Sequence, residues 1–147
     1  MIKLGNPDTV NHLIYLGLEW AKDAAMKDFD EDEWRATVRG YSIYVDHRSL
    51  CFYDALNKPA GFLLGAVTKI PHSGVMVGQI HYVYLKPEHC TYENFYQLHE
   101  EFRNWAESFG VKQLTAPDFY QLPDEYDEFF IDLGFEESTY QKIKGLA

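Results

Sequence analysis

The sequence predicts a single α/β domain in which a mixed central sheet carries helices on both faces. The chain has 147 residues, a length that suits one domain with one core. Apolar residues recur at helical spacing in some segments and form strand-like runs in others. The expected order is β α α β β β α β α β. Three consecutive strands followed by alternating helices and strands require both antiparallel and parallel pairing.

A short strand and two helices are expected in the first 45 residues. The strand is IKL (2–4), after which Asn6 and Pro7 provide an N-cap and a first helical residue. The first helix extends to about Met26, and its apolar positions are Val10, Leu13, Ile14, Gly17, Leu18 and Ala21. The second helix begins in DFDEDEW (28–34), and its apolar stripe consists of Trp34, Val38, Tyr41 and Val45.

The rest of the chain is expected to hold three strands and then two helices that alternate with two further strands. Turn signals at Asn57 and in PHSG (71–74) separate strands at 50–55, 60–70 and 76–85. Gly110 and Gly134 close the two helices, at 92–109 and 124–133, and strands follow at 111–116 and 136–144. The inward residues of the longer helix are Phe95, Leu98, Phe102, Trp105 and Phe109.

The composition argues against several classes of function. The formal charge of −10 disfavours nucleic acid and anionic membranes as partners. Cys51 and Cys90 are too few for a disulfide framework, and neither they nor the histidines have the spacing of metal ligands, so we expect no metal. The first residues lack the apolar core of a signal peptide, and no apolar run approaches about 18 residues. We therefore expect a cytoplasmic protein.

Three segments in order carry a family resemblance: QIHYVYLKPEH (79–89), FRNWAESFGVKQLTA (102–116) and FFIDLGFEES (129–138). Together with the element order and the opening MIKLGNPDTVNHLIYLGLEW (1–20), they resemble the GNAT (Gcn5-related N-acetyltransferase) superfamily, and in particular its small phage-encoded members. The resemblance covers nearly the whole chain. It implies one GNAT-like domain over residues 1–147, acetyl-CoA as the cofactor, and an amine as the acyl acceptor.

The resemblance also assigns the cofactor positions. In the family, a splayed strand bonds the pantetheine arm through its backbone, and the turn that follows presents N–H groups to the pyrophosphate. The strand positions correspond to Val83, Tyr84 and Leu85, and the turn positions to Cys90, Glu93 and Phe95.

The turn lacks the family's pattern of Arg or Gln followed by two small residues. Glu93 places a negative charge near the expected phosphate, and Phe95 takes the place of a small residue. Glu93 also complements the start of a helix, which is reason enough for a carboxylate there. We expect a degenerate turn in which the side chains of Tyr92, Glu93 and Phe95 block the phosphate position.

Two catalytic positions depart from the family as well. Phe130 stands where many members have a tyrosine general acid, and Gln79 where many have a glutamate base. His81 lies two residues after Gln79 on the same strand face and is a candidate base, while Tyr126, one helical turn before Phe130, is a candidate acid. The alternatives are that His81 only bonds a neighbour on the sheet and that Tyr126 only packs.

Two functions follow from these observations. The first is a GNAT-fold protein that resembles acetyl-CoA-dependent N-acetyltransferases, with weak or absent activity. The second is a non-catalytic phage structural or host-protein-binding component. Acidic clusters at 28–33 and 124–128 either complement helix starts or form a rim that attracts an amine-bearing substrate or a basic protein partner.

Overall fold

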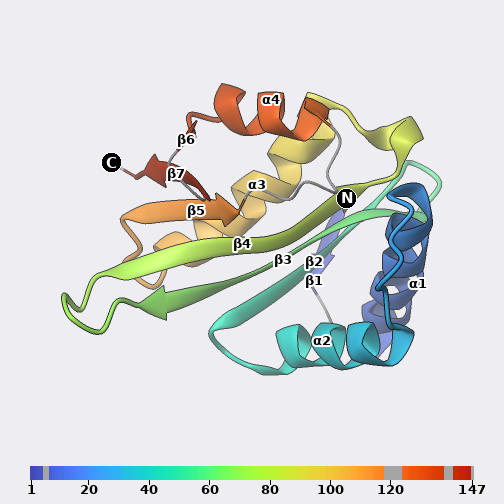
Figure 1. Cartoon of the computed structure of the whole chain (residues 1–147), viewed down its shortest axis with the longest axis horizontal. Coiled ribbons are helices and arrows are strands. Elements are labelled where there is room, and N and C mark those ends of the chain that lie inside the picture. Colours follow the sequence, from blue (N-terminus) through green and yellow to red (C-terminus); the bar gives the residue numbers. More distant parts are fainter. Residues whose placement is uncertain (5–6, 118–123, 138–140, 147) are drawn as a thin grey trace.

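The computed structural model describes residues 1–4, 7–117, 124–137 and 141–146, which form one mixed sheet flanked by helices (Figure 1). The order of the strands in the sheet is β1-β2-β3-β4-β5-β7-β6. Their bounds are β1 Ile2–Leu4, β2 His47–Tyr53, β3 Pro59–Lys69, β4 Met76–Leu85, β5 Gln113–Pro117, β6 Glu136–Glu137 and β7 Gln141–Gly145. The β4–β5 pair is parallel and the other neighbours are antiparallel. The predicted α/β fold class with a mixed sheet is confirmed.

Helices cover both faces of this sheet, as the sequence predicts. They are α1 Pro7–Asp23, α2 Glu31–Ile43, α3 Tyr92–Glu107 and α4 Asp124–Asp132, with a short 3₁₀ turn at Pro87–His89. One buried cluster joins the sheet to α3 and α4 through rings such as Phe102 and Phe130. A second cluster joins the opposite face to α1 and α2 through Trp20 and Trp34. None of the described helices is long and apolar enough to cross a membrane.

Several predicted boundaries are wrong, each for a local reason. The first helix ends at Asp23 rather than Met26, because Ala25 adopts a left-handed conformation with φ 51°. The second helix ends at Ile43, so Val45 lies beyond it and is 83% exposed instead of completing the apolar stripe. The single strand expected at 136–144 is two paired strands, β6 and β7. The predicted N-cap Asn6 lies outside the described residues.

The strand β4, which runs from Met76 to Leu85, separates from β5 after Gln79. Only residues 77–79 of β4 pair with β5, whereas β3 pairs with β4 as far as Leu85. The β3–β4 register shifts between Leu64 and Gly65, so His81 is the extra residue of a β-bulge. Figure 1 shows β4 continuing well past the end of β5. The polar backbone groups on this free side of β4 therefore need partners other than a strand.

Candidate functional site

A tyrosine side chain fills the gap between β4 and β5. The hydroxyl of Tyr126, from α4, accepts a hydrogen bond from the Leu85 N–H at 2.6 Å and donates one to the Leu85 carbonyl at 3.2 Å. The side chain is 1% exposed, and burial raises the pKa of Tyr126, so the phenol stays protonated. One hydroxyl thus satisfies both the donor and the acceptor that Leu85 would otherwise offer to a ligand.

Little free space remains beside this tyrosine. The cavity measures about 80 Å³ and is lined by Trp20, Asp23, Ala24, Tyr84, Leu85, Pro87, Cys90, Glu125 and Tyr126. Pockets for drug-sized ligands span roughly 300–1,000 Å³, so a pantetheine arm does not fit unless side chains move. Burial, followed by the nearby Glu125 carboxylate, raises the pKa of the Cys90 thiol to about 11. Cys90 is therefore a neutral thiol and a poor nucleophile.

The turn between β4 and α3 satisfies its own N–H groups. Those of His89, Cys90 and Thr91 donate to carbonyls within the turn, at 2.8, 3.3 and 2.9 Å. Thr91 is the N-cap of α3, and its hydroxyl accepts from the N–H of Asn94 at 3.2 Å. These three N–H groups, which belong to the turn at 88–93 for which no open nest is predicted, are therefore not free for a ligand. A polar residue immediately before an apolar-periodic helix is the N-cap signal that identifies Thr91 in the sequence.

The three side chains expected to block this turn do not share that role. Glu93 and Tyr92 point outward and are exposed. Phe95 is 2% exposed and packs on the rings of Tyr126, Phe129 and Phe130, with centroids 5.6, 5.2 and 5.0 Å away. The Phe95 ring lies in the core, as predicted for the inward residues of this helix, so it is not exposed on the turn.

The other two strand positions assigned by the resemblance are also engaged. Val83 is buried in the α3–α4 cluster, and it pairs with Leu63 of β3. Tyr84 faces α1, where its hydroxyl donates to the Asp23 carboxylate. Burial and this carboxylate raise the pKa of Tyr84.

The candidate base His81 lies beside Gln79, as predicted, but both of its ring nitrogens have partners. Nδ1 is bonded to the hydroxyl of Tyr41, and Nε2 lies 3.3 Å from Oε1 of Gln79. Burial, and then the neighbouring His47, lower the pKa of His81, so the ring is neutral at pH 7. Burial raises the pKa of Tyr41 to about 12, which makes its hydroxyl the donor to Nδ1. Nε2–H then donates to Gln79, and no lone pair is left for a substrate proton.

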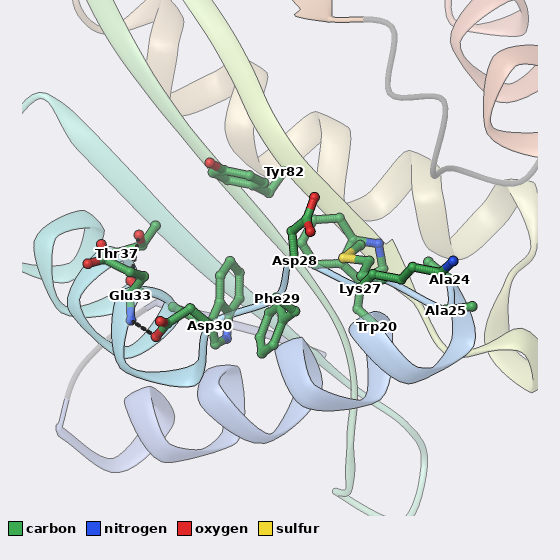
Figure 2. A pocket seen from close by; sticks show the side chains of 12 residues that line it. Trp20, Ala24, Ala25, Lys27, Asp28, Phe29, Asp30, Glu33, Thr37 and Tyr82 are labelled. Carbon is green, nitrogen blue, oxygen red and sulfur yellow. Dashed lines mark hydrogen bonds between the residues drawn. The ribbon is translucent and has the colours of Figure 1, made fainter.

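A larger pocket of about 480 Å³ opens between α1 and α2, over β4 (Figure 2). It adjoins the small cavity, since Trp20 and Ala24 line both. Its lining residues are Trp20, Ala24, Ala25, Met26, Lys27, Asp28, Phe29, Asp30, Glu33, Trp34, Thr37 and Tyr82. Sequence reasoning missed this aromatic pocket, because its rings come from α1, the α1–α2 loop, α2 and β4.

The acidic cluster at 28–33 divides between the two roles considered for it. Asp30 caps α2 by accepting the N–H of Glu33 at 3.1 Å, and Glu31 pairs with Arg35 at 3.1 Å. Asp28, Asp30 and Glu33 also line the large pocket. No group of three or more His, Cys, Asp or Glu side chains in the described part of the chain is arranged to hold a metal ion.

The structure is similar to those of solved acetyltransferases over nearly its whole length. The ribosomal-protein-alanine N-acetyltransferase of Brucella melitensis biovar Abortus 2308 matches with a TM-score of 0.72 and 13% identity, over 95% of this chain and 94% of that one. A GNAT-family acetyltransferase of Streptococcus pneumoniae matches with a TM-score of 0.74 and 12% identity, over 100% and 99%. Aminoglycoside N-acetyltransferase AAC(6')-Iy, in complex with CoA, matches with a TM-score of 0.78 and 15% identity, over 94% and 88%.

No protein-family model matches the sequence, and no curated protein matches it significantly. At the identities of the structural matches, shared architecture does not establish shared chemistry. The chain has the fold of the GNAT acetyltransferases.

Proposed function

We propose that this chain is a GNAT-fold binding protein for a cationic ligand, with acetyl transfer slow or absent because its own side chains close the acetyl-CoA groove. The observation that carries the proposal is the double hydrogen bond of Tyr126 to Leu85. That backbone position is the one that the family resemblance assigns to the pantetheine arm. A buried side chain already holds it, and the adjoining cavity of about 80 Å³ is too small for the arm.

The state of the catalytic candidates supports the same proposal. Tyr126 commits its proton to a carbonyl, and its raised pKa opposes proton donation to a thiolate. His81 is held between Tyr41 and Gln79 without a free lone pair. Phe130 is buried and has no proton to give. The large pocket, by contrast, is open and has carboxylates on its lining, which suits a cation.

Calorimetric titration with acetyl-CoA and CoA tests the proposal. Neither ligand is expected to bind with a dissociation constant below about 0.1 mM. A micromolar dissociation constant would overturn the closed groove and favour the second candidate, an acetyl-CoA-dependent N-acetyltransferase. One observation favours that candidate: β4 and β5 diverge as a pantetheine arm requires, even though Tyr126 now fills the gap.

A further inference from the structure

Aromatic rings set at steep angles wall the large pocket. The centroid of the Tyr82 ring lies 5.9 Å from that of Trp20 and 5.8 Å from that of Trp34, with interplanar angles of 68° and 86°. Phe29 adds a third side, 6.2 Å from Trp34 and tilted by 47°. Figure 2 shows Trp20, Phe29 and Tyr82 among the side chains that line this pocket. The four rings pack against one another edge to face or tilted, and all four line the pocket.

The electrostatics of the pocket favour a positive ligand. Asp28, Asp30 and Glu33 line it together with a single cation, Lys27. The C-terminal end of α1 also faces it through Trp20, and the C-terminal end of a helix carries a partial negative charge. Faces of Trp and Tyr rings attract cations through the quadrupole of the ring.

The aromatic walls suit a methylated ammonium. The Trp34 indole N–H donates to the Leu13 carbonyl at 3.2 Å, so it is not available to a ligand. A compact primary ammonium is strongly hydrated and would depend on Asp28, Asp30 and Glu33 to replace its water. A methylated ammonium spreads its charge over methyl groups and donates no hydrogen bond, and Met26 adds a polarisable wall for it.

Trp20 provides an independent indication of a ligand. It is 8% exposed, and its indole Nε1 is buried without a hydrogen-bond partner among the described residues. Leaving a buried donor unpaired is unfavourable. A ligand acceptor that reaches this N–H, from the large pocket or from the adjoining small cavity that Trp20 also lines, would satisfy it.

We propose that this pocket binds a quaternary, fully methylated ammonium group that is linked to a hydrogen-bond acceptor. The inference rests on the proposed function and names its ligand class. A quaternary ammonium has no lone pair with which to attack a thioester. A pocket specialised for it has no use for acetyl-CoA, in keeping with the groove that Tyr126 fills.

Titration with matched small molecules tests the proposal. Choline is compared with its neutral isostere 3,3-dimethyl-1-butanol and with ethanolamine, which lacks the methyl groups. Calorimetry measures affinity, and intrinsic fluorescence reports on the pocket because Trp20 and Trp34, two of the three tryptophans, line it. Choline is expected to bind at least about tenfold more tightly than either analogue. Equal binding of the neutral isostere, or tighter binding of ethanolamine, overturns the proposal.

A second titration identifies whether the ammonium group belongs to a protein or to a small molecule. It compares the affinity for a peptide that contains trimethyl-lysine with that for the same peptide with unmodified lysine. Preference for the methylated peptide supports the proposal and places the ammonium on a protein. Preference for choline supports it and indicates a small molecule. Failure of both to bind at about 10 mM overturns it.

Two variants tie the binding to the pocket. Phe29→Leu and Asp28→Asn change half-buried or exposed side chains and are each expected to weaken choline binding severalfold. Tyr44→Leu, at an exposed ring outside this pocket, is the matched control and is expected to leave it unchanged. Unaltered affinity in both pocket variants overturns the assignment. If the chain binds CoA and still prefers choline over its analogues, the closed groove is refuted and the ammonium pocket stands. If it binds neither CoA nor choline, the ammonium pocket is refuted and the closed groove stands.

Discussion

Replacing Tyr126 with phenylalanine isolates the hydroxyl that closes the β4–β5 gap. Tyr126→Phe keeps the ring against Phe95 and Phe129 but removes both hydrogen bonds to Leu85. The Leu85 N–H is then buried without its partner, which costs about 1–3 kcal/mol of the free energy of unfolding. For a chain of this size, that loss lowers Tm by about 3–10 °C. Urea and thermal unfolding, followed by circular dichroism, measure both quantities.

The matched control for this substitution is Tyr44→Phe. The Tyr44 ring is 62% exposed, so loss of its hydroxyl is expected to leave the free energy of unfolding within about 0.5 kcal/mol of the parent. The reasoning is refuted if Tyr126→Phe is as stable as Tyr44→Phe, because the Leu85 amide would then have found another partner. The same variant is also expected to bind CoA more tightly than the parent, since opening the groove no longer breaks the two hydrogen bonds to Leu85.

Three further pairs of substitutions test the core and its charges. Phe95→Ala is expected to lower the free energy of unfolding by about 3–5 kcal/mol, because the ring is buried against Tyr126 and Phe130. Glu93→Ala, at the exposed start of the helix, is expected to lower it by at most about 1 kcal/mol. Equal values from urea unfolding would mean that the Phe95 ring is exposed on the turn. Gly17→Ala places a Cβ 1.9 Å from the Trp34 indole and is expected to destabilise the protein by about 1–3 kcal/mol. In Gly40→Ala the nearest atom to the new Cβ is 3.9 Å away, and the substitution is expected to stabilise its helix by about 0.5–1 kcal/mol. Thermal melts in which Gly17→Ala is the more stable variant would contradict the packing of α1 on α2. Burial, and then Lys144, lower the pKa of His99 from 6.5 to about 4, so the unfolded chain binds the extra proton and the free energy of unfolding falls by about 3 kcal/mol as the pH drops from 6.5 to 4. His99→Leu is expected to remove that part of the pH dependence, whereas His72→Leu, at an exposed position, is expected to keep it. Urea unfolding across this pH range measures the free energy of unfolding of both variants. If that free energy falls equally with pH in the two, His99 is not held neutral in the fold.

The order and type of the elements follow from local patterns, and these patterns are strong here. The helix at Tyr92–Glu107 carries five apolar rings and aliphatic residues on one stripe, and an α-helix is the conformation that buries such a stripe. The predicted helices extend past the observed ends of α2 and α3, Ile43 and Glu107, because Val45 and Phe109 continue the apolar pattern beyond the last helical turn. Val45 fits the period of the helix but lies past its end. Periodicity indicates which face is buried more reliably than it indicates where the chain leaves the helix.

The site was harder to predict, because its parts lie far apart in the sequence. Tyr126 and Leu85 are separated by 41 residues, and no local pattern states that the hydroxyl of one reaches the backbone of the other. Phe95 had two conflicting assignments, one from the family's turn and one from its helical stripe. The stripe prevailed, since leaving a phenylalanine exposed beside a core that can accept it loses about 1.5–3 kcal/mol.

The closed groove has a quantitative consequence for any CoA that binds. To open the groove, Tyr126 must give up two hydrogen bonds and expose a ring that is now 1% exposed. The lost bonds contribute about 1–3 kcal/mol and the exposed ring about 1.5–3 kcal/mol. A ligand that binds only the open state has its affinity reduced by the population of that state, here roughly 10²–10⁴-fold. A dissociation constant of about 1 μM in an open groove therefore becomes roughly 0.1–10 mM. Ligands of the α1–α2 pocket do not incur this cost, because Tyr126 is absent from its lining.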